Sequence, residues 1–537
     1  MTGGVSDTSF GAGGLAFIGL YLLLMVGLGW AACQRQAQNS LSGFYLAGRD
    51  LGALVLLLTL YATQYSGNNL LGFPGQAHRI GFLWVMSVGF MTSVVVAYLA
   101  FAPRLYQSSR RHAFVTPGDW IEHRFASPAL SLLAAVLLLI VLINFLLAQL
   151  MAMGHVVAVL SGGLLPFWAG VIGLSLVVLL YETIGGMRAV AWTDCAQGVM
   201  LLLGIIGIMV AVLPDGESLG NGNLGNGNLG SGNLGSGNLG SGNLGSGNIG
   251  SEGIAAASLW IMEHQPAKAA VPSAGGVQAW FSTLLLVSLS AAVYPQAIQR
   301  IFAARSTRAL RHSIGVMAFM PLVTTLPLFL VGILSLPVLA GLDGNEAGIA
   351  ADQVMPQLLN HWAGQSLWLW FLANLVLLGV VAAIMSTADS VLLSLSSILS
   401  KDVLAKTWLR GASSVTLTTW GKRLSWLVMA ALVAFALSPR ISLWGLIELK
   451  LEVLIQVSPL FFLGVLWPGL TARGALIGML AGFILAVSLS LTGHGKPFGW
   501  HAGLWGLALN LTLAWGISVL ILRSSPTKVG GSAKEEK

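Results

Sequence analysis

Charged residues are scarce in this sequence. Asp, Glu, Lys and Arg make up 8% of its 537 residues, whereas 56% are hydrophobic and the mean hydropathy is +0.82. Soluble globular proteins carry roughly 25% charged residues, so this composition excludes that class. Apolar runs of about 20 residues recur along the chain, and each is long enough to cross a bilayer. The strands of a membrane barrel would be shorter and would alternate. The sequence therefore predicts an all-α polytopic membrane protein.

Cysteine is also scarce, since Cys33 and Cys195 are the two in the chain. Two cysteines supply neither a disulfide framework nor a zinc-type ligand set. No predicted span combines a nucleophile with a positioned base, and His155 and His361 stand alone, which argues against an enzyme. The apolar run at 13–32 has no basic residues before it and no cleavage site after it, so we expect a retained helix rather than a signal peptide.

The apolar runs form about 13 predicted transmembrane spans. They lie near 13–32, 51–76, 81–104, 129–155, 161–182, 189–213, 277–303, 312–335, 366–398, 422–438, 441–466, 474–492 and 503–522. If the N-terminus lies outside, the outer loops hold only Arg79, Lys268, Arg440 and Lys496. The inner loops then hold nearly all the other Lys and Arg residues, with Arg300 counted among them.

This asymmetry predicts a multi-pass protein of the cell (inner) membrane, with its N-terminus outside and its C-terminus in the cytoplasm. The net charge of +7 is then an orientation signal rather than a nucleic-acid site. We expect the lipid bilayer and a small-molecule solute as partners, no nucleic acid, and no obligate protein partner.

A pentad repeats from Gly220 to Ile249 as GNGNL or GSGNL and finally GSGNI. Gly, Asn and Ser do not build a hydrophobic core, so 214–276 is expected to be a flexible outer loop. A short solenoid is the alternative for the pentads. We assign the repeat no function.

Two of the predicted spans are interrupted by polar residues or proline. The stretch LLLTLYATQYSGNNLLGFPG, from Leu56 to Gly75, begins apolar and then inserts amides, hydroxyls and helix breakers. The seventh span reads SLSAAVYPQAIQR, with Pro295 and Gln296 near its middle. Unpaired backbone groups are tolerated in lipid only where they face protein, water or a ligand, and freed carbonyls suit a small hard cation such as sodium. A kink relieved by neighbouring helices is the alternative.

Interrupted helices at corresponding places in two halves are typical of inverted-repeat transporters. This pattern predicts a five-plus-five core. It divides the chain into 1–50 (an extra helix and first inner loop), 51–213 (first repeat), 214–276 (the outer loop), 277–466 (second repeat) and 467–537 (two further helices and the tail).

Hydroxyl and carboxyl groups gather in the ninth and sixth spans. On a helix, one face would carry Ala383, Ser386, Thr387, Ser390 and Ser394. Such residues also serve simply to pack membrane helices, but Asp389 lies deep in the same span, and an intramembrane carboxylate is a functional candidate. Asp194 lies about one turn inside the sixth span, and could be a helix-start carboxylate stabilised by the helix dipole or a second carboxylate near the cation path.

The eleventh span contains an unusual charged cluster. Glu448 and Glu452 are one turn apart, and Lys450 points elsewhere. A lysine at this depth needs a partner or a water-filled cavity, so the three residues are candidates for coupling, with snorkelling to an interface as the alternative. In the fourth span, Asn144 and Gln149 are the main polar side chains and could bond neighbouring helices or face a solute.

Several motifs in order resemble the sodium:solute symporter family. They are FYLAGRDLG, YSGNNLLGFPG, YETIGGMRAVAWTDCAQ, AAIMSTADSVLL, SILSKDV and GALIGMLAG. The resemblance covers roughly 13–520 and favours the bacterial proline, pantothenate and short-carboxylate branch. It implies sodium-driven uptake by alternating access, with ten core helices, one extra helix before them and two after.

The resemblance also implies a set of cation ligands. The sodium site would use the backbone carbonyls of Ala62, Tyr65 and Ala383 and the hydroxyls of Ser386 and Thr387. A second cation or proton region, present in some members, would use Asp194, Asp389 and Ser390 with Ser386. Two departures argue against proline as the solute: Gln64 replaces an aspartate of the proline branch, and Val287 and Ala291 replace aromatic residues.

We therefore predict a sodium-coupled symporter that imports a small polar solute, an organic acid or amino acid rather than a sugar, with Na⁺ as the coupling ion. The candidate solute contacts are Gln64, Ser66, Gly67, Asn68, Asn69, Gln149 and Tyr294. A proton-coupled transporter using Asp389 or Asp194 is the first alternative. A non-transporting sensory module is the second, although the tail LRSSPTKVGGSAKEEK is too short to hold a signalling kinase.

Overall fold

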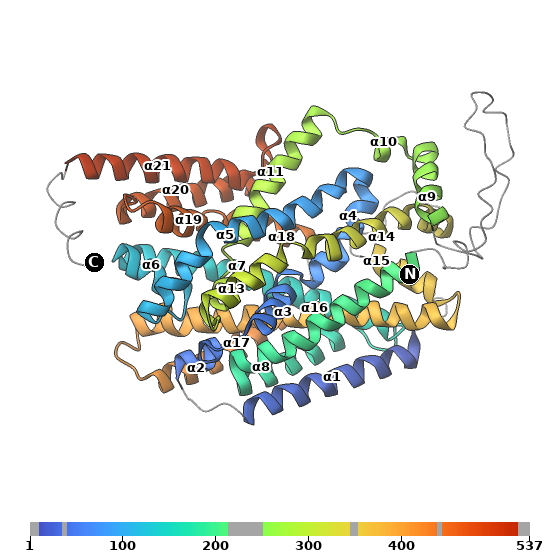
Figure 1. Ribbon diagram of the computed structural model, residues 1–537, viewed down its shortest axis with the longest axis horizontal. Helices are drawn as coiled ribbons and strands as arrows, with labels where there is room; N and C mark the ends of the chain where they lie inside the picture. The colour runs from blue at the N-terminus through green and yellow to red at the C-terminus, as the bar shows by residue number, and fades with distance from the viewer. Residues whose placement is uncertain (1–9, 35–39, 213–250, 344–352, 438–442, 525–537) are drawn as a thin grey trace.

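The protein is a bundle of long helices that run side by side (Figure 1). The computed structural model describes residues 10–34, 40–212, 251–343, 353–437 and 443–524. Within these ranges, ten helices are long and apolar enough to cross a membrane. Helix α1 runs along the bottom of Figure 1 and α21 along the top, so the two lie on opposite sides of the bundle. The predicted all-α membrane fold is confirmed.

The elements follow the chain in the order that Figure 1 labels. They are α1 (Gly11–Gln34), α2 (Leu41–Leu46), η1 (Ala47–Arg49), α3 (Ala53–Gln64), α4 (Gly67–Ile80), η2 (Gly81–Val85), α5 (Met86–His112), α6 (Pro117–Phe125), α7 (Pro128–Leu160), α8 (Phe167–Val212), α9 (Ser251–His264), α10 (Pro266–Ala269), α11 (Ala274–Ala291), α12 (Pro295–Ala303), α13 (Thr307–Met317), α14 (Met320–Asp343), α15 (Val354–Ala363), α16 (Leu367–Ser397), η3 (Ile398–Val403), η4 (Leu404–Lys406), α17 (Ser414–Ala436), α18 (Leu443–Leu454), α19 (Ser458–Leu466), α20 (Ala472–Leu491), η5 (Pro497–Gly499) and α21 (Ala502–Ser524).

The predicted spans all contain helix, but their division along the chain differs. Two of them, 161–182 and 189–213, lie in the single 46-residue helix α8, which bends at Gly186. Gly186 has φ +52°, and a Cβ there would meet the Phe44 carbonyl at 2.5 Å, so this bend requires glycine. Which end of the bundle faces outward stays a prediction.

The segment 251–276 contains helices α9 and α10, although it was expected to belong to a flexible loop. Its sequence, SEGIAAASLWIMEH, has apolar residues at helical spacing, and Ile261 and Ala257 are buried in the core. The pentads Gly220–Ile249 lie outside the described residues.

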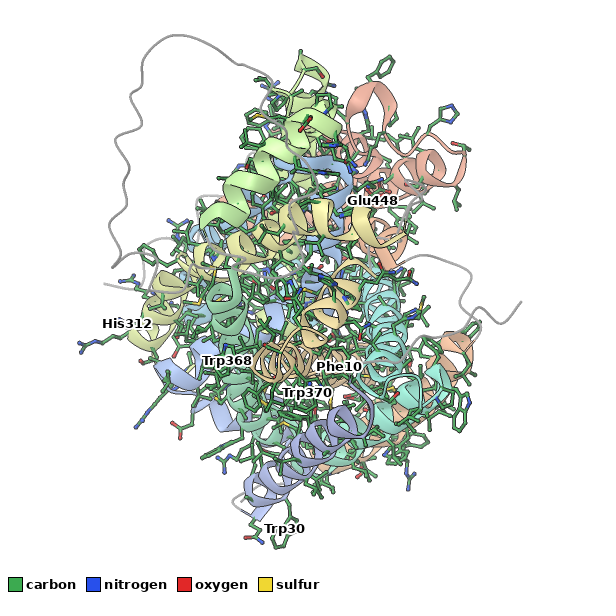
Figure 2. The ribbon with its side chains drawn as sticks, turned by 90° about the vertical axis from the view of Figure 1, so that its right-hand side faces the viewer. Phe10, Trp30, His312, Trp368, Trp370 and Glu448 are labelled. Atoms are coloured by element: carbon green, nitrogen blue, oxygen red, sulfur yellow. The ribbon has the colours of Figure 1, made fainter. Side chains whose placement is uncertain are left out.

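Large apolar side chains cover the outside of the bundle, as lipid contact requires. Trp30 projects from the edge of the bundle in Figure 2 and is 65% exposed. Leu20 and Leu23 on the same helix are also exposed. Inside the bundle, buried hydroxyls such as those of Thr193 and Ser175 donate to backbone carbonyls one turn earlier, which satisfies them without water.

Both predicted interruptions are present, and the residues at each break are buried. The first interrupted span stops at Gln64, passes through an extended Ser66 (φ −77°, ψ 164°) and restarts at Gly67. The second stops at Ala291 and restarts at Pro295, whose missing N–H and fixed φ suit the first position of a helix. Helix α16 contacts α3, α4 and α12, so both interruptions face it.

The start of α3 and the end of α12 are joined by backbone hydrogen bonds. The Leu51 amide donates to the Ala303 carbonyl (3.1 Å), and the Arg305 amide donates to the Leu51 carbonyl (2.9 Å). These bonds form an isolated parallel bridge between Leu51 and Ala304. The bridge connects the two interrupted spans, which are separated by more than two hundred residues of sequence.

Candidate functional site

The first helix break lies directly against α16. A Cβ at Gly67 would overlap the Ile384 side chain, so the backbone at the break touches the residue next to Ala383. Backbone hydrogen bonding resumes at Ser66, whose carbonyl accepts from the Asn69 and Leu70 amides. In the described part of the chain, this leaves the carbonyls of Ala62 and Tyr65 without an amide partner. The break is therefore adjacent to α16, at the residue that follows Ala383.

Replacing Gly67 tests this close approach. We expect Gly67→Val to destabilise the protein by about 1–3 kcal/mol, because the new side chain must displace Ile384. The purified variant should unfold at a lower temperature than the parent. Adding sodium should also stabilise it less than the parent. Gly72→Ala on the same helix is the matched control, since a Cβ at Gly72 meets open space. Equal behaviour of the two variants would contradict the close contact.

Thr387 and Ser386 differ in their hydrogen bonding. The Thr387 hydroxyl is buried and has no partner among the described residues. Ser386 donates to Asp194 Oδ1 at 2.5 Å. The Thr387 oxygen is therefore the free ligand of the pair, whereas the Ser386 oxygen is already oriented by a carboxylate from α8.

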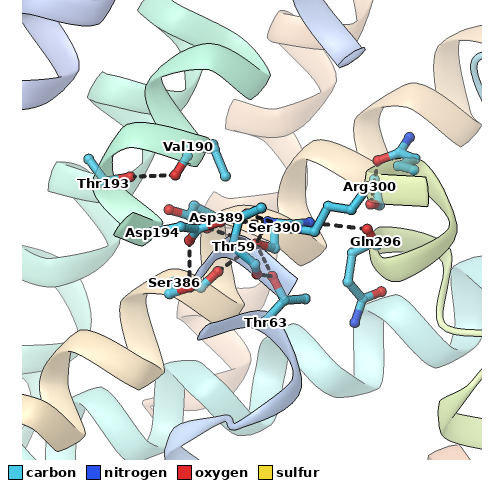
Figure 3. A network of polar contacts seen from close by, with 12 residues as sticks. Thr59, Thr63, Val190, Thr193, Asp194, Gln296, Arg300, Ser386, Asp389 and Ser390 are labelled. Carbon is cyan, nitrogen blue, oxygen red and sulfur yellow. Dashed lines mark hydrogen bonds and ion pairs between the residues drawn. The ribbon is translucent and has the colours of Figure 1, made fainter. Parts of the chain in front are cut away.

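Asp194 and Arg300 form a fully buried ion pair at the centre of Figure 3, with Arg300 Nη2 at 2.8 Å from Asp194 Oδ2. Thr59 bridges the two, since its hydroxyl donates to Asp194 and accepts from Arg300 Nε (2.7 Å). Arg300 also donates to the Gln296 carbonyl (3.1 Å) and to Ser390. The pair joins α8 to α12, α3 and α16 around one guanidinium.

The expectation that Arg300 lies in an inner loop is wrong. Its side chain is 0% exposed and lies inside the bundle. The charge rule counted Arg300 as a loop residue because a lone arginine inside lipid is unfavourable, but Asp194 compensates its charge. The predicted orientation rests on the other Lys and Arg residues and does not depend on Arg300.

Asp389 lies beside this pair but is held by neutral donors. Tyr181 donates to its Oδ2 at 2.6 Å, and the Ser390 hydroxyl lies 3.1 Å from its Oδ1. Among the described residues, no basic nitrogen lies within 4.0 Å of this carboxylate. Asp194 and Asp389 are thus close in space but differ in chemistry: one is paired with a cation and the other is not.

A cavity of about 230 Å³ lies next to the first break. Four of the predicted solute contacts line it: Gln64, Ser66, Asn69 and Tyr294. The Gln64 amide is buried next to the Tyr98 hydroxyl, which donates to the Ala291 carbonyl at 3.4 Å.

Three predicted solute contacts do not line this cavity. Gly67 packs on Ile384 instead. Gln149 is fully buried on α7, one turn after the lining residue Phe145, and its amide has no partner among the described residues. The side chain of Asn68 lies outside what the structure describes.

The charged cluster of α18 separates into three environments. Glu448, visible in Figure 2 from the end of the bundle, pairs with Lys496 at 3.1 Å. Glu452 accepts from Ser490 and lies 3.8 Å from His501 Nδ1. Lys450 points into the bundle, with its Nζ 3.2 Å from the centre of the Phe145 ring. Each carboxylate therefore has its own partner, and neither is paired with Lys450.

Sequence reasoning missed Arg300, Thr59, Tyr181 and Phe145. Arg300 was detectable, because it lies inside the predicted span 277–303 only five positions after Pro295. Thr59, Tyr181 and Phe145 carry no such signal, since Thr, Tyr and Phe are ordinary in membrane helices.

Known proteins that this chain resembles include symporters and other transporters. A family model described as "Sodium:solute symporter family" matches residues 44–224 and 248–482, and a model of pentapeptide repeats (8 copies) matches 218–254. The osmoregulated proline transporter OpuE of Bacillus subtilis (strain 168) is 25% identical over 524 residues, 95% of each chain. The sodium/pantothenate symporter of Escherichia coli (strain K12) is 27% identical over 203 residues, 37% of this chain but only 42% of that protein.

A solved structure extends the likeness to the fold. It is described as a substrate-bound, outward-open state of a Na⁺-coupled sialic acid symporter, and has a TM-score of 0.74 at 16% identity, covering 95% of this chain and 98% of its own. The family and this structural neighbour are transporters, not enzymes. Since the family model spans both helix breaks and the polar cluster around Asp194, the chain belongs to the sodium:solute symporter family.

Proposed function

We propose that the protein is a sodium-coupled symporter, which imports a small polar solute across the inner membrane by alternating access. Its N-terminus would lie outside and its C-terminus in the cytoplasm. One observation carries the proposal: among the described residues, the Ala62 and Tyr65 carbonyls at the first helix break lack an amide partner, and the break packs on α16, whose Thr387 hydroxyl also lacks a partner there. Such oxygen atoms are the ligands that a small hard cation takes, and they belong to two separate helices.

The arrangement of this site supports coupling. A cation bound between the break and α16 would hold the two together, and Gln64, Ser66 and Asn69 of the same break line the solute cavity. If sodium binds the form in which the cavity is open better than the closed form, it raises the affinity for the solute, and the solute raises the affinity for sodium.

We infer that one sodium ion binds at the first site, with ligands Ala62, Tyr65, Ala383, Ser386 and Thr387. The second predicted region already contains a cation of the protein itself, because the Arg300 guanidinium contacts Asp194 and Ser390. Asp389 supports the alternative of proton coupling, since it accepts a hydrogen bond from Tyr181 and has no ion pair in the described region.

Uptake into proteoliposomes tests the proposal. A panel of labelled amino acids and short carboxylates should include at least one solute that accumulates with an inward sodium gradient and not when choline replaces sodium. Asp389→Asn should then leave the sodium dependence intact.

Two other outcomes would replace this proposal. The proton-coupled alternative would be established if accumulation does not depend on sodium, requires a proton gradient and is lost in Asp389→Asn. Sodium-dependent binding without accumulation of any solute would indicate a sensory module.

A further inference from the structure

Lys450 is a cation buried inside the bundle. It lies on α18 and is 4% exposed. Its Nζ lies over the Phe145 ring of α7, 3.2 Å from the ring centre, and 5.6 Å from the centre of the Tyr294 ring at the start of α12. The two rings pack against each other with their centres 5.2 Å apart. The ammonium therefore faces two aromatic walls at the second helix break.

No carboxylate of the described chain neutralises this ammonium. The nearest acidic residues in sequence, Glu448 and Glu452, pair with Lys496 and lie beside His501 and Ser490 instead. No carboxylate oxygen among the described residues lies within 4.0 Å of Lys450 Nζ. Ring faces attract a cation, but this attraction is smaller than the desolvation penalty of a buried ion. An anion from elsewhere would complete the site.

The cavity supplies space for that anion. Lys450, Phe145 and Tyr294 line it together with Gln64, whose amide is buried. Arg79 and Lys496 line the same cavity, and its one lining carboxylate, Glu448, is already paired with Lys496. The lining thus carries excess positive charge, which favours entry of an anion.

The remaining lining describes the other part of the solute. Phe73, Leu286 and Val287 provide apolar surface, and the cavity measures about 230 Å³. A molecule that suits it is small, with one anionic group and a short apolar body.

We propose that Lys450 binds the carboxylate of a small organic anion, which is the transported solute, while the Gln64 amide bonds a second polar atom of that solute. This inference rests on the proposed function, since it assigns a charge to the solute of the same cavity. It gives Lys450 a role in binding rather than in cation coupling, and separates it from Glu448 and Glu452.

Thermal unfolding of the purified full-length protein in sodium buffer tests the inference. The probes are monocarboxylates from acetate to benzoate, each compared with the amide of the same acid. We expect carboxylates to raise the unfolding temperature and their amides to leave it unchanged. In Lys450→Met, the apparent affinity for the stabilising carboxylates should fall at least about tenfold, and Lys450→Arg should retain part of it. Without any solute, Lys450→Met should unfold at a higher temperature than the parent, because an uncompensated charge is gone.

Lys496→Met is the matched control. It removes a positive charge from the outer part of the same cavity, where Lys496 is half exposed, and should change carboxylate affinity far less. The inference is overturned if amides stabilise as well as acids, if no carboxylate stabilises the protein, or if Lys450→Met keeps carboxylate affinity. A lower unfolding temperature of solute-free Lys450→Met would also overturn it, because the ammonium would then be satisfied by the protein.

A sodium titration of the same samples separates this inference from the proposed function. Lys450→Met should keep the stabilisation by sodium over choline, because Thr387 and the first break are unchanged. If sodium stabilises neither protein, the proposed sodium coupling fails, whatever the carboxylates do. If sodium stabilises both but carboxylates act on neither, the assignment of Lys450 fails alone.

Discussion

Asp194→Asn is expected to destabilise the protein by about 3–5 kcal/mol, because it leaves the fully buried guanidinium of Arg300 without its counter-charge. The loss should appear as a large fall in the unfolding temperature of the purified protein and as low recovery from membranes. Thr59 and Ser390 would remain as partners of Arg300, but neutral hydroxyls do not balance a buried charge.

Two variants control this prediction. Removing both charges, as in Asp194→Asn with Arg300→Gln, should recover much of the lost stability, since no buried charge then remains unpaired. Glu122→Gln removes one partner of the more exposed Glu122–Lys406 pair and should change stability by less than about 1 kcal/mol. An Asp194→Asn protein as stable as the parent would show that Arg300 is compensated by other groups.

Thr387→Ala should raise the sodium concentration for half-maximal stabilisation by roughly tenfold, the effect of losing one oxygen ligand. This variant tests the sodium site more directly than Ser386→Ala, because the Thr387 hydroxyl has no hydrogen bond to lose among the described residues. Ser386→Ala should also weaken sodium binding, but it removes the 2.5 Å bond to Asp194 as well. The measurement is the unfolding temperature at increasing sodium, with choline keeping the ionic strength constant.

Ser394→Ala on the same face of α16 is the control for the sodium titration. Its hydroxyl donates to Gln299 Oε1 at 2.6 Å and lies two turns from Ser386, so its removal should leave the sodium titration unchanged. A normal sodium response in Thr387→Ala would contradict the proposed ligand set.

The fold was predictable because its main determinants are local in sequence. Apolar length identifies a membrane helix, and amides, glycine and proline within it identify a break, so both interruptions were found close to their actual positions. The flexible outer loop was predicted to extend through 251–276, where the structure has helix. The polar repeat before this segment obscured its apolar face.

The polar cluster could not be predicted to the same extent, because its partners are distant in sequence. Asp194 and Arg300 are separated by 106 positions, and nothing local to either residue identifies the other. Lys450 was recognisable as a residue in need of a partner, but the aromatic residues that face it come from α7 and α12. The family resemblance supplied the proposed cation ligands, and the contacts of Arg300 emerged from the structure.

The backbone bridge at Leu51 has a mechanical consequence. It connects α3 to α12 at one end, and the hydrogen bond between Thr59 and Arg300 connects them again in the interior. Pulling the two discontinuous helices apart would break both connections, so they are expected to move as one rigid unit. Opening would then take place at the contacts of this unit with neighbouring helices such as α5, α8 and α16, while α3 and α12 keep their relative positions.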